Sequence, residues 1–277
     1  MLTIGITGGK GGTGKSTVAT ALSVELGKKH KVLLVDMDVD CPNDHLIINI
    51  KRQEIKTVYQ RIPIWDYELC NNCGLCASVC KTNAIISIQD KKPIFIPTQC
   101  NGCGSCVIKC PTDAISWHKK EIGTIYSGHN HGIDFLSGEL KITEPVSEFI
   151  VNTINDILKT KKKNYDYIIV DTAAGTHCDV IAALEICDFT YIVTEPTPLG
   201  KHDADIIIQL INKMGTPYEV ILNRFEQDDS IISSMLKKVN KTIAFRIPYK
   251  KSIIEEYSKG IPINDESIKQ IAKSLIK

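Results

Sequence analysis

The chain has 277 residues, and its 33 lysine and arginine residues nearly balance 32 aspartate and glutamate residues, so the formal net charge is +1. This length suits one large α/β domain with a small insert, and a charge near zero does not favour nucleic acid as a partner. No run of about eighteen apolar residues occurs and no basic leader precedes the first apolar stretch, so we expect a cytoplasmic protein without a membrane span.

The first predicted strand, Leu2–Thr7, leads into a glycine-rich loop, Gly8–Ser16, and helical periodicity follows over Thr17–Lys29. The loop fits the pattern G-x4-G-K-[ST], in which glycines let backbone N–H groups converge on phosphate oxygens. Lys15 is expected to neutralise phosphate charge, and Ser16 to offer its hydroxyl to Mg²⁺. The residues predicted to bind ATP in this loop are Gly9, Gly11, Gly12, Thr13, Gly14, Lys15, Ser16 and Thr17.

A second lysine, Lys10, lies inside the same loop. With it, the loop resembles the deviant phosphate loop of the MinD and Mrp superfamily, which also includes ParA proteins and the nitrogenase iron protein. In that superfamily the extra lysine reaches the phosphates across a dimer interface. The resemblance therefore implies a homodimer with ATP at its interface, and a catalytic role for Lys10 together with Lys15.

The next predicted strand, Val32–Asp36, is followed by Asp38 and Asp40 at the carboxyl edge of the sheet, where an α/β fold presents its ligands. This segment resembles switch I of Mrp proteins. The resemblance implies that Asp38 positions or deprotonates the attacking water and helps to hold Mg²⁺, and that Asp40 lies near the metal or the switch. The alternative is a loop whose carboxylates only cap the following turn.

Eight of the eleven cysteines fall into two tandem runs with the spacing C-x2-C-x2-C-x3-C of bacterial ferredoxins. Three cysteines of one run surround three corners of a [4Fe–4S] cluster, and the fourth crosses to the other cluster. The predicted ligands are Cys70, Cys73, Cys76 and Cys110 for cluster 1, and Cys100, Cys103, Cys106 and Cys80 for cluster 2.

An internal repeat supports this pairing, because Cys80-Lys-Thr-Asn-Ala-Ile and Cys110-Pro-Thr-Asp-Ala-Ile follow the two runs in register. The alternative is a pair of zinc knuckles, which would need ligands in two separated pairs instead of four in one run. The cluster spacing also indicates thiols kept reduced in the cytoplasm instead of disulfides.

We predict an inserted 2[4Fe–4S] ferredoxin domain over residues 62–118, between a Pro63 boundary and the glycine-containing stretch Gly123–Gly132. The ATPase domain would comprise residues 1–61 and 119–277. A helix predicted over Val146–Lys159 returns the chain to the next strand. The insert therefore follows switch I, where its clusters could sense nucleotide-driven movement.

The strand Tyr167–Asp171 and the following Thr-Ala-Ala-Gly175 resemble a Walker B strand and switch II. The resemblance implies that Asp171 holds Mg²⁺ and that the Gly175 N–H senses the γ-phosphate. A later strand ends at Asn223, which the family uses on the adenine edge, and Pro248 is also expected in the nucleotide site.

Further strands are predicted over Phe189–Thr194 and Thr242–Ile247. The predicted helices in this half of the chain are Lys201–Met214, Ser230–Val239, Ser252–Lys259 and Glu266–Ile276. Strands that alternate with helices indicate a doubly wound, mainly parallel α/β sheet, with the ferredoxin-like insert as a small α+β domain.

Cys178 lies seven residues after Asp171, the offset of a bridging-cluster cysteine in the nitrogenase iron protein. Such a cluster needs two cysteines per subunit, and Cys41 and Cys187 match no ligand motif, so packing is the preferred interpretation. Polar or structural roles are also preferred for His129 and His131, for the charge run Lys161–Lys163, and for the amphipathic C-terminal helix.

The leading hypothesis is an ATPase with Mg²⁺ and two [4Fe–4S] clusters per protomer that couples dimer switching to low-potential electron transfer. Its partner would be an unidentified redox protein or iron–sulfur enzyme. One alternative is an iron–sulfur cluster carrier of the Mrp type, although no C-x2-C pair follows Cys110. A third is a MinD- or ParA-like switch that senses redox state.

Overall fold

In the computed structural model, which describes residues 1–276, the main sheet has nine strands in the order β11-β10-β9-β1-β8-β2-β7-β6-β3. The seven strands of the body are β1 (Leu2–Thr7), β2 (Val32–Met37), β7 (Ile133–Leu140), β8 (Tyr167–Thr172), β9 (Phe189–Thr194), β10 (Tyr218–Phe225) and β11 (Ile243–Pro248). Within this group of seven, every pair of neighbouring strands is parallel. The mainly parallel α/β fold is therefore confirmed.

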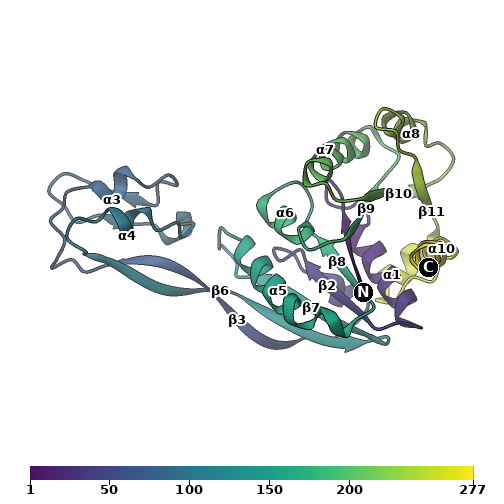
Figure 1. Cartoon of the computed structure of the whole chain (residues 1–277), viewed down its shortest axis with the longest axis horizontal. Helices are drawn as coiled ribbons and strands as arrows, with labels where there is room; N and C mark the ends of the chain where they lie inside the picture. Colours follow the sequence, from purple (N-terminus) through teal and green to yellow (C-terminus); the bar gives the residue numbers. More distant parts are fainter. Residues whose placement is uncertain (277) are drawn as a thin grey trace.

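Helices cover both faces of this sheet (Figure 1). One face carries α1 (Lys15–Gly27), α2 (Asp44–Ile47) and α10 (Glu266–Leu275); the other carries α5 (Glu148–Lys161), α6 (Cys178–Leu184), α7 (Pro198–Met214) and α8 (Ser230–Lys237), and α9 (Lys251–Ser258) follows β11. Successive side chains of a strand point to opposite faces of the sheet. Leu34 belongs to the same apolar cluster as Leu22 of α1, whereas Val35 belongs to the cluster on the other face, with Ile154 of α5. Continuous apolar strands are what burial on both faces requires.

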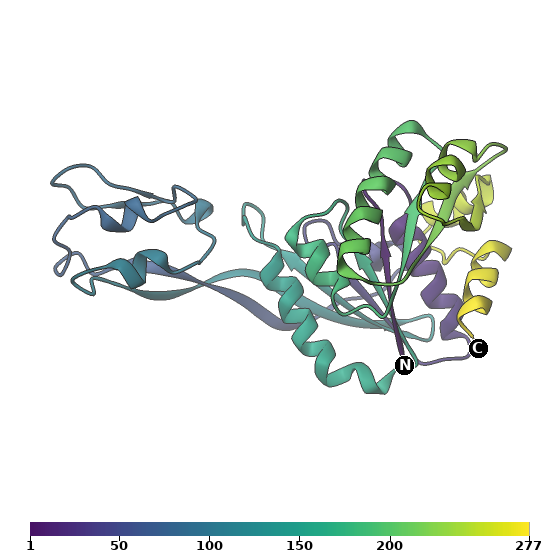
Figure 2. The ribbon, with the colours of Figure 1, turned by 45° about the horizontal axis from the view of Figure 1, so that its top comes forward.

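The remaining two strands, β3 (Gln53–Trp65) and β6 (Ile115–Asn130), form a long antiparallel ribbon. Near the body, β6 pairs with β7 from Gly123 to Asn130. Beyond that point residues 115–122 pair with β3 alone, so the ribbon projects about 25 Å from the body. Figures 1 and 2 show this projection from two directions.

The ribbon leaves the body at the edge where the nucleotide loop lies. Because β6 is antiparallel to both β7 and β3, β3 runs in the same direction as β7 and β2. The carboxyl end of β3 therefore points beyond the carboxyl ends of the parallel strands. That edge is where doubly wound folds bind ligands.

A small lobe, residues 66–114, sits at the tip of the ribbon (Figure 2). It contains α3 (Leu75–Ser78), α4 (Ser105–Lys109), and a two-stranded antiparallel sheet of β4 (Ile85–Ile86) and β5 (Ile94–Phe95). Its apolar interior is made largely of cysteines and isoleucines, including Cys76, Cys106 and Ile115. A core this small is marginal by itself.

The ribbon is the main difference from the sequence predictions. The stretch Gly123–Gly132 was expected as a boundary loop, but most of it is β6 and the turn to β7. The ribbon also runs through positions 62 and 118, at which we predicted the insert to begin and end. The strands and helices that were predicted for the body are present, with ends shifted by a few residues, whereas β7, α2 and α6 were not predicted.

No helix within residues 1–276 is long and apolar enough to cross a membrane.

Candidate functional site

The glycine-rich loop between β1 and α1 lines a large pocket at the carboxyl edge of the sheet. Most of the residues predicted to bind ATP lie around it: Gly11, Gly12, Gly14, Lys15, Ser16, Thr17, Asp38, Asn223 and Pro248. The backbone of Gly14 has φ 94°, a left-handed conformation that favours glycine, and it opens the N-terminus of α1 toward this space. A helix N-terminus in this setting favours a bound phosphate.

Three predicted residues make contacts within the protein here. The Asn223 amide donates to the Thr13 carbonyl at 2.8 Å, and the Gly175 N–H donates to the Gly8 carbonyl at 3.3 Å. A Cβ on Gly14 would lie 2.1 Å from the Asn223 amide nitrogen, so only glycine fits there. Asn223 and Gly175 therefore fasten the phosphate loop to β10 and to the end of β8.

Lys10 and Lys15 have different surroundings. Lys15 is buried, which lowers its pKa, although the nearby carboxylates of Asp171 and Asp38 raise it. Lys10 points the other way and forms an ion pair with Glu195, with Nζ 2.5 Å from Oε1. Glu195 also accepts from Arg224 at 3.2 Å. Lys10 is thus held by Glu195 within the chain and does not line the pocket.

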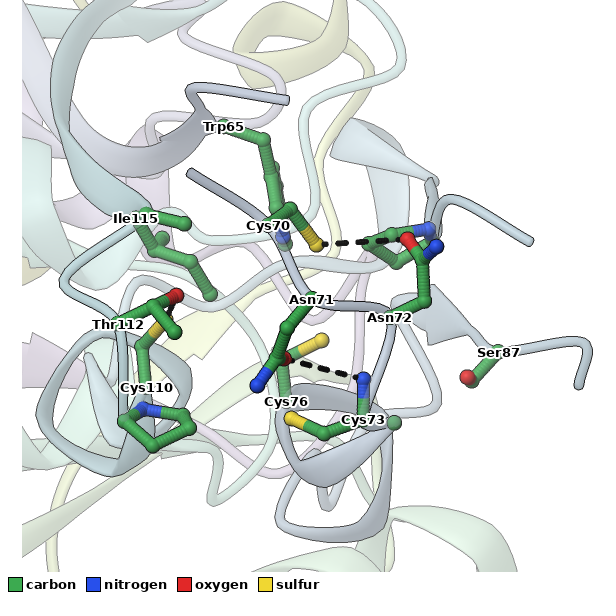
Figure 3. A pocket seen from close by; sticks show the side chains of 14 residues that line it. Trp65, Cys70, Asn71, Asn72, Cys73, Cys76, Ser87, Cys110, Thr112 and Ile115 are labelled. Carbon is green, nitrogen blue, oxygen red and sulfur yellow. Dashed lines mark hydrogen bonds between the residues drawn. The ribbon is translucent and has the colours of Figure 1, made fainter. Parts of the chain in front are cut away.

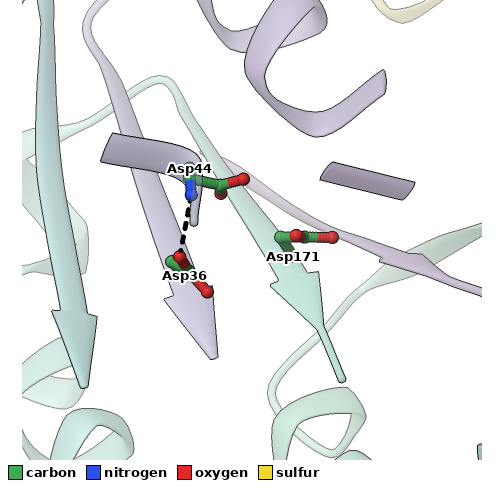
Figure 4. A group of neighbouring side chains, drawn as sticks. All are labelled: Asp36, Asp44 and Asp171. Carbon is green, nitrogen blue, oxygen red and sulfur yellow. Dashed lines mark hydrogen bonds between the residues drawn. The ribbon is translucent and has the colours of Figure 1, made fainter. Parts of the chain in front are cut away.

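Three buried carboxylates, Asp36, Asp44 and Asp171, lie close together near the carboxyl ends of β2 and β8 (Figure 4). Asp36, the second-to-last residue of β2, pairs with Asp171 on β8, and Asp44 comes from the first turn of α2. Within the described residues they form the one group of three or more acidic, histidine or cysteine ligand atoms that all lie within 4.8 Å of one another. Asp36 accepts backbone N–H groups from Asp38, Asn43 and Asp44. It therefore folds the loop after β2 around its own carboxylate.

The oxygens of Asp44 and Asp171 have no hydrogen-bond partner in the described chain. Burial raises the pKa of Asp171 to about 7, against the lowering effects of the Ser16 hydroxyl and Lys15. The pKa of Asp44 is raised well above its ordinary value by burial and then by Asp171. Carboxylate oxygens beside the Ser16 hydroxyl are suitable ligands for Mg²⁺. The positive charge of the ion would offset the cost of ionising these buried carboxyl groups.

The loop after β2 lies against the start of α6. Burial raises the pKa of Asp38 and Asp40, and the carboxylate of Asp179 on α6 raises both further. We call residues 36–43 the switch I segment and residues 172–179 the switch II segment. Their negative side chains face one another, so a cation or a rearrangement at this edge affects both segments.

Cysteines from both runs surround one cavity in the lobe. Figure 3 shows Cys70, Cys73, Cys76 and Cys110 around it, together with Trp65 and Ile115. Three of these thiols come from the first run and one from the end of the second, which is the predicted crossed set. The loop around Cys73 is shaped by Asn71, whose side chain accepts the Cys73 N–H at 3.3 Å.

The other four cysteines also gather. Cys80 packs against Cys100 in a small apolar cluster with Ile62 and Ala84. Burial raises the pKa of Cys100, and the thiols of Cys103 and Cys80 raise it further. Burial likewise raises the pKa of Cys106 to about 11, with added effects of Cys100 and Cys103. A cationic metal centre among these sulfurs would stabilise their thiolate forms and so offset the cost of ionising the buried thiols.

The spacing of the sulfurs differs from that of a zinc site. Tetrahedral zinc with Zn–S bonds near 2.3 Å requires sulfurs about 3.8 Å apart. In the described chain no three cysteine sulfurs lie within 4.8 Å of one another. The sulfurs in both sets are therefore further apart than a single tetrahedral zinc ion requires.

A buried donor also faces the first cavity. The indole nitrogen of Trp65 is buried and has no hydrogen-bond partner among the described residues. Burial raises the pKa of Cys76, whereas the nearby Trp65 N–H lowers it. An N–H in this position is suited to a thiolate or sulfide acceptor. The donor set, the spacing and this orphan N–H all fit an iron–sulfur centre.

The three remaining cysteines differ in exposure. Cys187 is buried in the core and its thiol donates to the Ala183 carbonyl, whereas Cys41 and Cys178 are exposed in the two switch segments. Of the histidines, His129 pairs with Asp134 at 2.7 Å and His131 contacts the Ile48 carbonyl at 2.8 Å. These contacts explain both histidines without a metal.

Several pocket residues were not predicted from the sequence. The side of the pocket away from the phosphate loop is lined by Arg224, Tyr249, Lys250, Ile253, Ile254 and Tyr257. The two tyrosines and apolar α9 side chains form a surface suitable for a flat base. Glu195 was also missed, because its partner Lys10 is distant in the sequence and no local pattern marks it.

A family described as "CobQ/CobB/MinD/ParA nucleotide binding domain" matches residues 4–263. An uncharacterized protein of Methanocaldococcus jannaschii is 36% identical, over 94% of this chain and 90% of the relative. The septum site-determining protein MinD of Thermotoga maritima is 25% identical, over 97% of this chain and 83% of the relative.

Among solved structures, MinD from Pyrococcus horikoshii, complexed with Mg-ADP, has a TM-score of 0.64 at 20% identity and covers 100% of this chain and 96% of its own. MinD in the MinC:MinD complex of Aquifex aeolicus has a TM-score of 0.59 at 21% identity, with coverage of 100% and 96%. At these identities the structures show the fold alone.

Because Asp44 is buried, we predict that removing its charge raises the free energy of unfolding by an amount that depends on pH. At pH 8, without Mg²⁺ or nucleotide, Asp44→Asn should raise the free energy of unfolding by about 1–3 kcal/mol, because an amide replaces an unpaired buried carboxylate. The folded-state pKa of Asp44 is raised, so the cost of its charge grows as the pH rises above the ordinary carboxyl pKa of about 4, and the gain should be smaller at pH 5 than at pH 8.

Urea denaturation at both pH values measures this difference. Asp40→Asn is the matched control, since Asp40 is an exposed carboxylate in the neighbouring segment and its substitution should change stability less. An equal gain at both pH values, or no gain at pH 8, would contradict the assignment.

Proposed function

The chain belongs to the CobQ/CobB/MinD/ParA nucleotide-binding family and is a ParA/MinD-like ATPase, and we propose that it couples its nucleotide state to low-potential electron transfer through two [4Fe–4S] clusters. The observation that supports this proposal is the lobe at the end of the ribbon, where Cys70, Cys73, Cys76 and Cys110 line one cavity and Cys80 packs against Cys100. The electron acceptor would be a protein partner.

At the nucleotide site, the proposal assigns one task to each element. The N–H groups of the phosphate loop and Lys15 bind the phosphates of ATP. Ser16 and Asp171 hold Mg²⁺, and Asp38 orients the attacking water. The base lies between Asn223 and the α9 surface. The Mg-ADP bound to the P. horikoshii relative supports this class of ligand.

We further propose that Lys10 acts in the partner subunit of an ATP-bound homodimer. In the single chain Lys10 is paired with Glu195 and lies outside the pocket lining. To reach a phosphate it must leave this pair. Dimer formation would then exchange one ion pair, to Glu195, for another, to the partner's nucleotide.

In the lobe, the first set of cysteines would hold one [4Fe–4S] cluster and the second set the other, and such clusters supply reversible one-electron transfer at low potential. The protein's part is to hold eight thiolates, exclude water around Cys76 and Cys106, and offer the Trp65 N–H to a sulfur. The exposed thiols Cys73 and Cys103 place both sets near the lobe surface. A partner could therefore approach either one.

The crossed assignment predicts how single cysteine substitutions act. The full chain purified without oxygen should contain about eight iron and eight sulfide per protomer. Cys110→Ser should remove roughly four of each, because it takes one ligand from cluster 1 only, and the electron paramagnetic resonance (EPR) signal of the second cluster should remain.

Cys178→Ser is the matched control and should leave the count unchanged. A fall with Cys178→Ser would instead indicate a cluster bridging two subunits. Zinc in place of iron would exclude electron transfer. Rapid loss of both clusters to an apo-enzyme in the presence of a chelator would favour a cluster carrier.

Action of Lys10 across the dimer predicts rescue between two inactive variants. Lys10→Gln and Asp38→Ala should each lower ATP hydrolysis at least about 100-fold. In a mixed dimer, the subunit that keeps Asp38 receives Lys10 from its partner. Equal mixing should therefore restore about a quarter of the wild-type rate, since half of the dimers are mixed and each has one complete site.

Steady-state phosphate release from the mixture measures this rescue. Mixing Lys10→Gln with Lys10→Gln,Asp38→Ala is the control and should stay inactive. If the first mixture also stays inactive while both proteins bind ATP and dimerise, Lys10 acts within its own subunit.

A further inference from the structure

A line of contacts joins the switch II segment to the second set of cysteines. It starts at Asp179, which is buried in the first turn of α6 and raises the pKa of both Asp38 and Asp40 across the nucleotide edge. The Ser147 hydroxyl, just before α5, donates to the Asp179 carboxylate at 3.2 Å. The segment ahead of α5 is therefore attached to the part of the site that nucleotide would rearrange.

That segment, residues 141–147, also contacts the ribbon. Its Lys141 N–H donates to the Ile122 carbonyl of β6 at 2.8 Å. Glu144, whose side chain is 9% exposed, forms an ion pair with Lys120 of β6, with Oε2 2.8 Å from Nζ. Apart from this pair, Oε2 has no hydrogen-bond partner in residues 1–276. The position of Glu144 therefore sets how much of the Lys120 charge is neutralised.

Lys120 faces the second set of cysteines. In the ribbon it lies directly opposite Gln60, and opposite residues of an antiparallel pair project from the same face. Gln60 is 1% exposed and its side-chain N–H donates to the Cys100 carbonyl at 3.1 Å. Consistent with this placement, the Lys120 charge acts to lower the pKa of Cys100, against the larger raising effect of burial.

The segment also contains a strained residue. Thr143 has φ 74°, in the left-handed region that is costly for a β-branched side chain, and the neighbouring Ile142 is 93% exposed. Strain of this kind is typical of segments that have two arrangements. A turn that relaxes when Ser147 moves would carry Glu144 toward or away from Lys120.

We propose that the Glu144–Lys120 ion pair transmits the nucleotide state of switch II to the reduction potential of the centre held by Cys80, Cys100, Cys103 and Cys106. This inference rests on the proposed function and adds its regulation. A positive charge near a cluster favours the reduced form, which carries one more electron. Loss of neutralisation by Glu144 therefore raises the potential, and closer pairing lowers it.

The test is an EPR-monitored redox titration of the full chain, with ADP and with a non-hydrolysable ATP analogue. In the wild type, one of the two potentials should depend on the nucleotide. Glu144→Gln should raise that potential, by about 59 mV for a tenfold change in the reduction equilibrium. Lys120→Gln should lower it. Both variants should lose the difference between the nucleotides.

Ser147→Ala keeps both charges and tests the connection itself. It should leave the potential with ADP near the wild-type value and abolish the nucleotide dependence. Hydrogen exchange of residues 141–147 gives a second readout that needs no cluster: it should depend on nucleotide in the wild type and not in Ser147→Ala. Glu121→Gln is the matched control, because Glu121 of β6 forms the other ion pair between the ribbon and this segment, a more exposed one with Lys141 at 2.7 Å.

Two results would overturn the inference. If the potential of Glu144→Gln and of Ser147→Ala still changes with nucleotide as in the wild type, the ion pair transmits nothing and the proposed function stands without it. If the purified protein contains no iron and sulfide, both proposals fail together. An equal effect of Glu121→Gln would show that any charge on the ribbon suffices, and would also contradict a specific role for Glu144.

Discussion

The pairing of β3 with β6 is the interaction on which the arrangement of both candidate sites depends. The ribbon is continuous with the main sheet through β7, so it is held by the same hydrogen bonds as the body where it starts. From residue 122 toward the lobe, β6 no longer pairs with β7, and the ribbon is held by its own cross-strand pairs, by the contacts of segment 141–147 and by the lobe. An isolated two-stranded ribbon has little independent stability, so its direction is sensitive to what it touches. Two ion pairs join that segment to the free ribbon, Glu144 with Lys120 and Lys141 with Glu121, and the first is the more buried, so it should influence the direction of the ribbon more.

At the nucleotide site, several buried carboxylates are costly to ionise. Three buried carboxylates, two of them without hydrogen-bond partners, lie beside Lys15, and a fourth, Asp179, faces the switch I segment. A fold can keep such a group because the ligand that it binds brings compensating positive charge. The same logic applies to Lys10, which is held by Glu195 in the single chain. The unpaired carboxylates and the Lys10–Glu195 ion pair both lie at the edge where nucleotide and a second subunit would bind. Binding could therefore replace each of them with a more favourable contact.

Local sequence patterns were enough to locate the candidate sites whose functional residues are close together in the sequence. The spacing of Gly9, Gly14, Lys15 and Ser16 located the phosphate loop, and the repeated cysteine runs located the two sets of thiols that the lobe brings together. The ribbon could not be predicted in this way. In its outer half, charged and apolar residues alternate irregularly, and β3 contains Pro63. The two strands stabilise each other by pairing, although the whole lobe separates them in the sequence. Long-range pairs such as Lys10 with Glu195, or Ser147 with Asp179, leave no mark in sequence spacing, and neither does the α9 side of the pocket. What the lobe binds stays a prediction.

The central claim is that nucleotide controls electron release from the lobe. The most direct measurement is stopped-flow oxidation of the reduced full chain by a small one-electron acceptor, with ADP and with a non-hydrolysable ATP analogue. The proposal predicts that the rate differs between the two nucleotides, and that Lys15→Gln, which cannot bind the phosphates properly, gives one rate in both. Equal rates for the wild type in both nucleotide states, with both clusters present, would contradict it.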